Sequence, residues 1–160
     1  MGCSSLIILP MQPEDLPEIL TLEAAALSAW NRDQLAAELE QPTGFQFVVR
    51  RKGTDRIIAF LCGRVMADEA EILKLSVAQS ERRKGVGRQL LDFVVKFYSE
   101  KGVKNCFLEL RASNTAARNL YEKEGFSIIG KRNNYYMEPA EDAILMKRKI
   151  ENSNPNTIIR

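Results

Sequence analysis

The segment from Leu75 to Arg88 constrains the fold of this 160-residue chain more than any other part of the sequence. Leu75-Ser76-Val77 has the aliphatic and β-branched character of a strand, a short polar turn follows, and an apolar stripe with helical spacing begins at Leu90. Between them lies Arg82-Arg83-Lys84-Gly85-Val86-Gly87. A strand, a glycine loop and a helix in this order can cradle an anion, because glycine lets the backbone come close and the helix N-terminus presents unpaired N–H groups.

The glycine loop differs from the two best-known nucleotide-binding loops. It does not end in Gly-Lys-Ser/Thr, as a P-loop does, and Leu90 stands at the third glycine position of the dinucleotide fingerprint. The charges of Arg82, Arg83, Lys84 and Arg88 still favour an anionic ligand. We therefore expect a pyrophosphate other than that of ATP or NAD. The alternative is a basic glycine turn that only begins a helix.

Extended and helical runs alternate along the chain, which predicts a mixed α/β domain. Strands are predicted at residues 6–9, 45–50, 57–65, 70–77, 105–110, 126–129 and 143–146. Helices are predicted from Pro13 to about Leu27, from a capping box at Asn31 to Leu39, from Gly87 to about Gly102, and from Thr115 to Glu124. We expect residues 1–150 to form one domain and residues 151–160 to be a polar tail of unassigned role.

Composition excludes several kinds of chemistry. The sequence contains no histidine, so Ser-His-Asp and Cys-His arrangements, imidazole metal sites and a histidine base are impossible. Cys3, Cys62 and Cys106 form no Cys-x-x-Cys pair, which favours a reducing compartment and argues against a thiolate metal site. The net charge of +2 is too small to indicate nucleic-acid binding. The apolar runs are shorter than the roughly 20 residues of a membrane span. We expect a cytoplasmic protein without a metal, a nucleic-acid partner or a membrane anchor.

The glycine loop also resembles motif A of the GNAT superfamily of N-acetyltransferases, in which Gln/Arg-x-x-Gly-x-Gly/Ala cradles the pyrophosphate of coenzyme A. Arg82, Gly85 and Gly87 fill these positions. Other runs resemble the RimI family, bacterial acetyltransferases of ribosomal-protein N-termini, and extend the resemblance over nearly the whole chain. These runs are Leu108 to Asn114, Ala116-Ala117, Leu120-Tyr121-Glu122, Gly125-Phe126, Asn134-Tyr135-Tyr136 and Glu141-Asp142-Ala143.

The resemblance implies a fold, a cosubstrate and an acceptor. The GNAT acyl-CoA N-acyltransferase fold has a central, mostly antiparallel sheet with one parallel, splayed pair of strands, flanked by about four helices. The cosubstrate is acetyl-CoA, and the acceptor is a protein N-terminus, in this family the alanine amine of protein eighteen of the small ribosomal subunit. Acetyl-CoA is expected to contact the backbone of residues 75–77, the loop and the side chain of Asn114, which also suits a helix N-cap. The residues expected to bind acetyl-CoA are Leu75, Ser76, Val77, Arg82, Arg83, Lys84, Gly85, Val86, Gly87, Arg88 and Asn114.

Two residues match the catalytic groups of the RimI family. An ammonium must lose a proton before it attacks the thioester, and without histidine a carboxylate is the natural base. Glu109 lies in an otherwise apolar run, where desolvation would make its carboxylate a stronger base, and it matches the general base of the family, acting through water. Tyr121 matches the general acid that protonates the departing thiolate. The alternatives are a surface glutamate and a ring packed against the sheet.

Three aromatic residues are candidates for contacts with the acceptor. Trp30 precedes the second helix, and Tyr135 and Tyr136 are predicted to lie in a loop between the last two strands, where a stabilising aromatic cluster is the alternative. Ala29 stands where the family has proline, next to Trp30. The acidic side chains Glu141 and Asp142 either pair with a basic substrate tail or begin a strand at the solvent edge.

The expected mechanism is direct transfer in a ternary complex, because no Cys or Ser lies beside a plausible activating base. Two other functions are compatible with the sequence. One is an acetyltransferase for other N-termini or for small amines, which the choice of acceptor would distinguish. The other is a non-catalytic module that binds acyl-CoA or associates with RNA, against which the presence of both Glu109 and Tyr121 argues.

Overall fold

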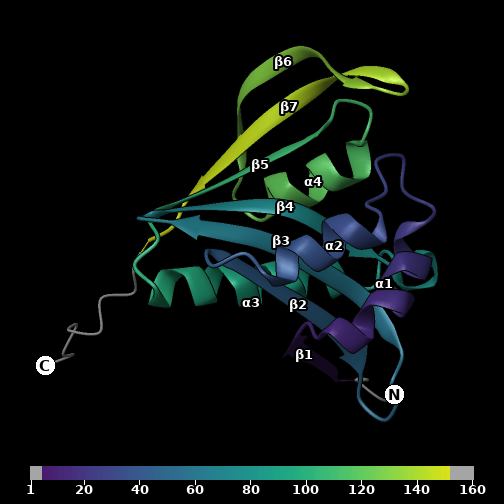
Figure 1. Cartoon of the computed structure of the whole chain (residues 1–160). Coiled ribbons are helices and arrows are strands. Elements are labelled where there is room, and N and C mark those ends of the chain that lie inside the picture. Colours follow the sequence, from purple (N-terminus) through teal and green to yellow (C-terminus); the bar gives the residue numbers. More distant parts are fainter. Residues whose placement is uncertain (1–4, 152–160) are drawn as a thin grey trace, which may run out of the picture. The chain divides into compact units, whose positions relative to one another are not determined.

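The computed structural model describes residues 5–151, which contain seven β-strands and four α-helices (Figure 1). The described residues form two compact units, one of residues 5–64 and 72–91 and the other of residues 65–71 and 92–151. The predicted mixed α/β class is confirmed. Cys3 and residues 152–160 of the predicted tail lie outside the described residues. The single domain over residues 1–150 stays a prediction.

The first unit is built on four strands in the order β1-β2-β3-β4. Strand β2 pairs antiparallel with both β1 and β3. These strands are β1 (Leu6–Pro10), β2 (Gly44–Arg51), β3 (Ile57–Met66) and β4 (Glu69–Val77). A 3-10 turn, Pro13–Asp15, leads into α1 (Leu16–Glu23), and α2 (Arg32–Leu39) follows. The predicted capping box is confirmed, since the backbone N–H groups of Asn31 and Gln34 each donate to the other residue's side chain at 2.9 Å.

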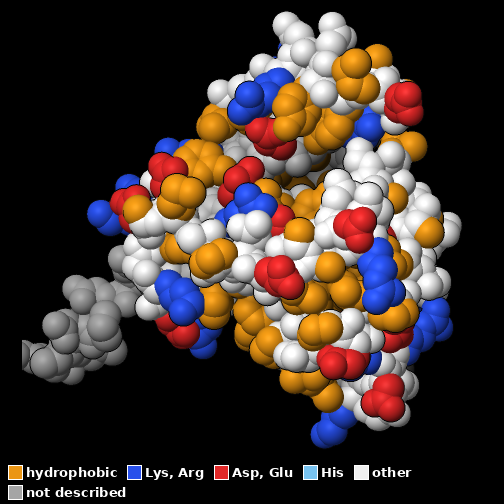
Figure 2. Space-filling model, in the orientation of Figure 1, with side chains coloured by type: hydrophobic (Ala, Val, Ile, Leu, Met, Phe, Trp, Pro, Cys, Tyr) orange, Lys and Arg blue, Asp and Glu red, His pale blue; other side chains and the backbone are white. Residues whose placement is uncertain are grey.

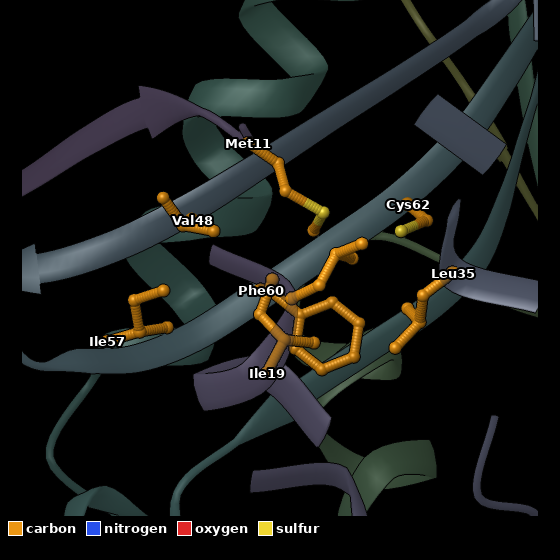
Figure 3. Packing of buried hydrophobic residues seen from close by; sticks show 8 residues of the cluster. Met11, Ile19, Leu35, Val48, Ile57, Phe60 and Cys62 are labelled. Atoms are coloured by element: carbon orange, nitrogen blue, oxygen red, sulfur yellow. The ribbon is translucent and has the colours of Figure 1, made fainter. Parts of the chain in front are cut away.

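Helices α1 and α2 cover the same face of β2 and β3 (Figure 1). Ile19 of α1 and Leu35 of α2 pack with Phe60 and Cys62 of β3, and all four side chains are fully buried (Figure 3). Truncating a buried phenylalanine such as Phe60 to alanine costs about 3–5 kcal/mol. Both helices are therefore firmly packed on the strands, and the connection between them, residues 24–31, begins and ends at fixed points.

The second unit contains three strands in the order β5-β7-β6, both pairs antiparallel. They are β5 (Asn105–Arg111), β6 (Ser127–Met137) and β7 (Ala140–Lys149), of which the last two form the long hairpin seen in Figure 1. Between β5 and β6 lies α4 (Thr115–Lys123). Helix α3 (Val86–Glu100) begins in the first unit and continues in the second. The buried Leu90, Leu91, Val94 and Tyr98 confirm its predicted apolar stripe.

The first helix ends earlier than the predicted Leu27. Helix α1 stops at Glu23, and the N–H of Ala26 then donates to the Glu23 carbonyl in a tighter turn. The Glu23 carboxylate is buried and accepts the backbone N–H of Trp30 at 2.9 Å. Because this contact folds the chain back on the helix end, the helical pattern of apolar residues cannot continue.

Strand β6 is longer than the predicted 126–129. It continues to Met137, so Tyr135 and Tyr136 lie within the strand and not in a loop. Two shifts in register with β7 interrupt it, one of them between Arg132 and Tyr136, where Asn134 has a φ of 49°. Such bulges break the alternation of polar and apolar residues by which a strand is recognised in a sequence.

Candidate active site

The basic loop of the first unit has a backbone suited to an anion. Arg83 has a φ of 61° and Gly85 a φ of 80°, two left-handed positions directly before α3. Backbone of this kind turns successive N–H groups toward one side and forms a concave anion-binding nest. The N-terminus of a 15-residue helix adds the positive end of its dipole. The loop residues thus fit the pyrophosphate of a coenzyme A.

Side chains around this loop stiffen it. The Arg82 Nε donates to the Val77 carbonyl at 3.2 Å, across the turn between β4 and the loop. Glu81 forms an ion pair with Arg51 of β2, and the Lys84 ammonium lies 3.9 Å from the same carboxylate. The hydrogen bond from Arg51 lowers the pKa of Glu81 below its usual range. The carboxylate therefore stays charged at neutral pH and anchors the loop to the sheet.

A pocket of about 560 Å³ opens in the first unit beside the turn after β4. Glu18 on its wall accepts the backbone N–H of Ile57 at 2.6 Å, which joins α1 to the beginning of β3. The lining residues are Glu18, Thr21, Leu22, Ala25, Arg56, Ile57, Ala78, Gln79, Ser80 and Arg82. Arg82 therefore borders both this pocket and the basic loop.

The predicted strand Leu75-Ser76-Val77 forms the end of β4 and is half-buried. Its Ser76 hydroxyl donates to the Glu23 carboxylate at 3.0 Å, and Glu23 also binds the N–H of Trp30. The structure thus brings together Ser76 and Trp30, one predicted for acetyl-CoA and one for the acceptor. Glu23 and its ion-pair partner Lys74, 2.8 Å away, were not predicted for the site. The signal for Glu23 was a carboxylate on the apolar face of the first helix, four residues after Ile19.

In the second unit, Glu109 on β5 forms an ion pair with Arg132 on β6, with 3.0 Å between Oε1 and Nε. Its side chain is 24% exposed, so the apolar strand does not bury it as expected. The Arg132 guanidinium also lies 5.7 Å from the centre of the Tyr135 ring. The structure therefore groups the predicted base with the predicted aromatic residues of β6.

Tyr121 on α4 is buried, with its ring edge-on to Phe126 at 5.5 Å between centroids. Burial raises the pKa of its phenol well above the usual range, so the hydroxyl keeps its proton. Asn114 is the N-cap of the same helix and accepts the N–H of Ala117 at 3.1 Å, as predicted. One helix therefore carries both the predicted acid and the predicted side-chain contact to coenzyme A.

The two tyrosines of β6 pack together and against a buried arginine. Their rings are edge-on at 5.2 Å between centroids, and the Arg111 guanidinium lies 4.3 Å from the centre of the Tyr136 ring. Arg111 also donates to the Glu138 and Pro139 carbonyls in the turn of the hairpin. Burial, and then the negative charge of Glu109, raise the pKa of Tyr136. The aromatic cluster is thus fixed to the strand that carries Glu109.

Glu141 and Asp142, for which pairing with a basic substrate tail was one alternative, have partners inside the second unit. Glu141 binds Arg111 at 3.2 Å and the N–H of Ser113, and these contacts lower the pKa of its carboxyl group. Asp142 accepts the N–H of Asn134 at 2.7 Å, which lowers its pKa in the same way. Both carboxylates therefore hold the hairpin together.

Among residues 5–151, no group of three or more His, Cys, Asp or Glu side chains is placed to hold a metal ion. Within the same residues, no helix has the length and apolar character needed to cross a membrane. Basic and acidic side chains are intermixed on the face shown in Figure 2.

Comparison with known proteins identifies the family of this chain. The sequence matches the acetyltransferase (GNAT) family over residues 14–126. It is 34% identical over 144 residues to the ribosomal protein bS18-alanine N-acetyltransferase of Escherichia coli K12, covering 88% of this chain and 95% of that protein. The crystal structure of the Escherichia coli ribosomal-protein-S18-alanine N-acetyltransferase is similar at a TM-score of 0.84 and 32% identity, over 95% of this chain and 98% of that one. Ard1 from Thermoplasma volcanium is similar at a TM-score of 0.81 and 27% identity, over 91% and 98%. The chain therefore belongs to the acetyltransferase (GNAT) family and is an acetyl-CoA-dependent N-acetyltransferase.

Proposed function

We propose that this protein transfers the acetyl group of acetyl-CoA to the N-terminal alanine amine of ribosomal protein bS18, in the cytoplasm. Residues 1–150 would act as one acetyltransferase domain. Similarity to the Escherichia coli bS18-alanine N-acetyltransferase over most of both chains supports this acceptor. The observation that carries the proposal is the backbone nest at Arg83 and Gly85 at the start of α3, which fits a coenzyme A pyrophosphate.

The residues of the first unit would bind both substrates. The N–H groups of residues 83–87 and the charges of Arg82, Lys84 and Arg88 would hold the pyrophosphate. The backbone of residues 75–77 would hold the pantetheine arm and polarise the thioester carbonyl. Bound acetyl-CoA supplies the activated acetyl group. Trp30, joined to β4 through Glu23, would line the acceptor pocket.

The residues of the second unit would move the protons. Glu109 would accept the proton of the acceptor amine through a water molecule, so that the nitrogen lone pair can attack the thioester carbon. As the carbon–sulfur bond breaks, Tyr121 would give its phenolic proton to the thiolate. Burial keeps this hydroxyl protonated, so that it can donate a hydrogen bond to the developing thiolate. Tyr135 and Tyr136 would contact the acceptor, and Asn114 would contact coenzyme A.

The test is acetyl-CoA-dependent thiol release with three acceptors compared directly. One is a peptide that copies the alanine N-terminus of bS18, the second is the same peptide with a blocked α-amine, and the third is a polyamine. We expect release with the free peptide alone. Thiol release with the blocked peptide or the polyamine would show that the enzyme acetylates an amine other than the α-amine of bS18. No release with any of the three, despite acetyl-CoA binding, would contradict catalysis.

A further inference from the structure

A buried charged cluster lies between α1 and β4 of the first unit. The Glu23 carboxylate is completely buried, and the Lys74 ammonium lies 2.8 Å from it with the lysine side chain 13% exposed. The same carboxylate accepts the Ser76 hydroxyl at 3.0 Å and the Trp30 backbone N–H at 2.9 Å. Lys74 also donates to the Ser28 carbonyl at 2.7 Å, and its ammonium lies 5.7 Å from the centre of the Trp30 ring.

Burying a charged cluster contributes little net free energy to the stability of a fold. Removing two charges from water costs several kcal/mol per ion, so a buried ion pair is often no more stabilising than apolar residues of the same volume. The unit already has an apolar core around Ile19, Leu35 and Phe60 directly beside it. What the cluster provides in addition is direction, because two of its hydrogen bonds fix backbone atoms, the carbonyl of Ser28 and the N–H of Trp30.

The backbone atoms that it fixes belong to the connection between α1 and α2. Lys74 and Ser76 are two residues apart in β4, so their side chains point to the same face of the strand. From there they hold the Ser28 carbonyl directly and the Trp30 N–H through Glu23. Between these two anchored residues lies Ala29. The hydrogen bond from Lys74 restrains the connection on one side of Ala29, and the hydrogen bond from Trp30 to Glu23 restrains it on the other.

We propose that Lys74 is a positioning residue, which fixes Ser28 and Trp30 on the strand that binds acetyl-CoA and so sets where the acceptor amine lies. This inference rests on the proposed function, in which Trp30 contacts the acceptor and the backbone of residues 75–77 holds the acetyl group. Since Lys74 acts through the connection, its removal impairs use of the acceptor and leaves binding of acetyl-CoA intact.

The test uses Trp30 as a reporter, because it is the only tryptophan in the chain. In Lys74→Met we expect tryptophan emission to shift to longer wavelength and quenching by acrylamide to increase, as the ring loses its partner. With the bS18 peptide we expect the acceptor KM to rise and kcat to fall, so that kcat/KM drops by about tenfold or more. The dissociation constant of acetyl-CoA should stay within about twofold. Lys74→Arg keeps the charge and donors and should recover part of the loss.

Two further variants separate positioning from stability. The double variant Glu23→Gln with Lys74→Met removes both buried charges. The amide oxygen can still accept the Trp30 N–H, and the amide NH2 can donate to the Ser76 hydroxyl. The double variant should recover thermal stability but not kcat/KM for the acceptor, because the bond to Ser28 is still missing. Arg64→Met breaks the ion pair between Arg64 and Glu38, which joins β3 to α2 in the same unit. It serves as the control, with acceptor kinetics unchanged.

The outcomes separate this inference from the proposed function. If the wild-type protein acetylates the peptide and Lys74→Met has an unchanged acceptor KM or an unchanged Trp30 emission, Lys74 is not a positioning residue. Recovery of acceptor kinetics together with stability in the double variant would also overturn it. If the wild-type protein binds acetyl-CoA but does not use the peptide, the proposed function fails first.

Discussion

Glu109 and Tyr121 have opposite surroundings, and the contrast suits opposite proton transfers. Glu109 is partly exposed and forms an ion pair with the Arg132 guanidinium. Tyr121 is buried against Phe126, and its raised pKa keeps the phenol protonated. A partly exposed carboxylate and a buried, protonated phenol suit the roles proposed for them as base and acid.

Glu109→Gln should lower kcat with the bS18 peptide by about 10²- to 10⁴-fold, the typical contribution of a general base. The dissociation constant of acetyl-CoA should stay within about twofold, because the role proposed for the carboxylate concerns the acceptor. Steady-state kinetics and equilibrium binding measure the two effects. The control is Glu100→Gln, at the exposed end of α3, which should leave both unchanged. An equal loss of turnover and acetyl-CoA affinity would contradict the assignment of Glu109.

Tyr121→Phe should lower kcat by about tenfold or more while the protein stays folded. The substitution removes only the hydroxyl and keeps the ring packed against Phe126, so the melting temperature should change little. Kinetics and calorimetry on the same preparation separate the two effects. A near-normal kcat would remove Tyr121 from the mechanism.

At the scale of elements, the loop before α3 owes its conformation to single backbone positions. Gly85 has a φ of 80°, and a Cβ placed there would meet nothing within 4 Å. A methyl group at Gly85 would therefore strain the backbone and not clash with another residue of the protein.

Gly85→Ala should cost about 1–2 kcal/mol of unfolding free energy and weaken acetyl-CoA binding, because alanine disfavours the left-handed conformation. Gly53, in the turn between β2 and β3, is a matched control with a φ of 85° and the same open space. Gly53→Ala should cost a similar free energy and leave acetyl-CoA binding unchanged. Urea unfolding and binding titrations measure both. Equal affinities in the two variants would mean that the loop does not bind the pyrophosphate.

Elements with one regular period could be predicted from the sequence, and contacts between distant segments could not. The apolar stripe of α3 and the capping box at Asn31 depend on local spacing, so both were predicted close to their actual positions. The predicted end of α1 was wrong because the chain folds back where the Glu23 carboxylate accepts the Trp30 N–H. That carboxylate is also bound by Ser76, 53 positions further along the chain. The predicted length of β6 was too short because bulges interrupt the alternation of polar and apolar residues along the strand. In the site, the glycine loop is a sequence motif, whereas the ion pair of Glu109 with Arg132 arises only from the pairing of strands through β7.

At the scale of the whole molecule, ionised carboxylates hold neighbouring elements together. Glu81 joins the loop before α3 to β2, Glu141 joins the hairpin to the chain before α4, and Asp142 holds the bulge of β6. All three have a pKa below the usual range, each because of its hydrogen bonds to the neighbouring groups. Their contribution to stability therefore depends on pH.

The free energy of unfolding should fall as the pH is lowered from about 7 to below about 4. A carboxyl group whose pKa is lowered by folding binds fewer protons in the folded state. Its stabilisation is complete above the pKa of the unfolded chain and is lost as the pH falls through the folded value. Urea unfolding followed by circular dichroism at several pH values tests this for wild type and for Glu141→Gln. The variant should be less stable at neutral pH, with a shallower dependence on pH, whereas parallel curves would contradict a role for Glu141.

Two of the cysteines affect how the reaction can be followed. Cys62 and Cys106 are completely buried, and burial raises the pKa of each thiol to about 12. Only the thiolate reacts quickly with disulfide reagents, so neither side chain competes for such a reagent while the protein is folded. A colorimetric disulfide therefore reports the coenzyme A thiol released in each turnover without titrating these two positions. The same reagent, added in denaturant, becomes a direct measure of how much of the protein has unfolded.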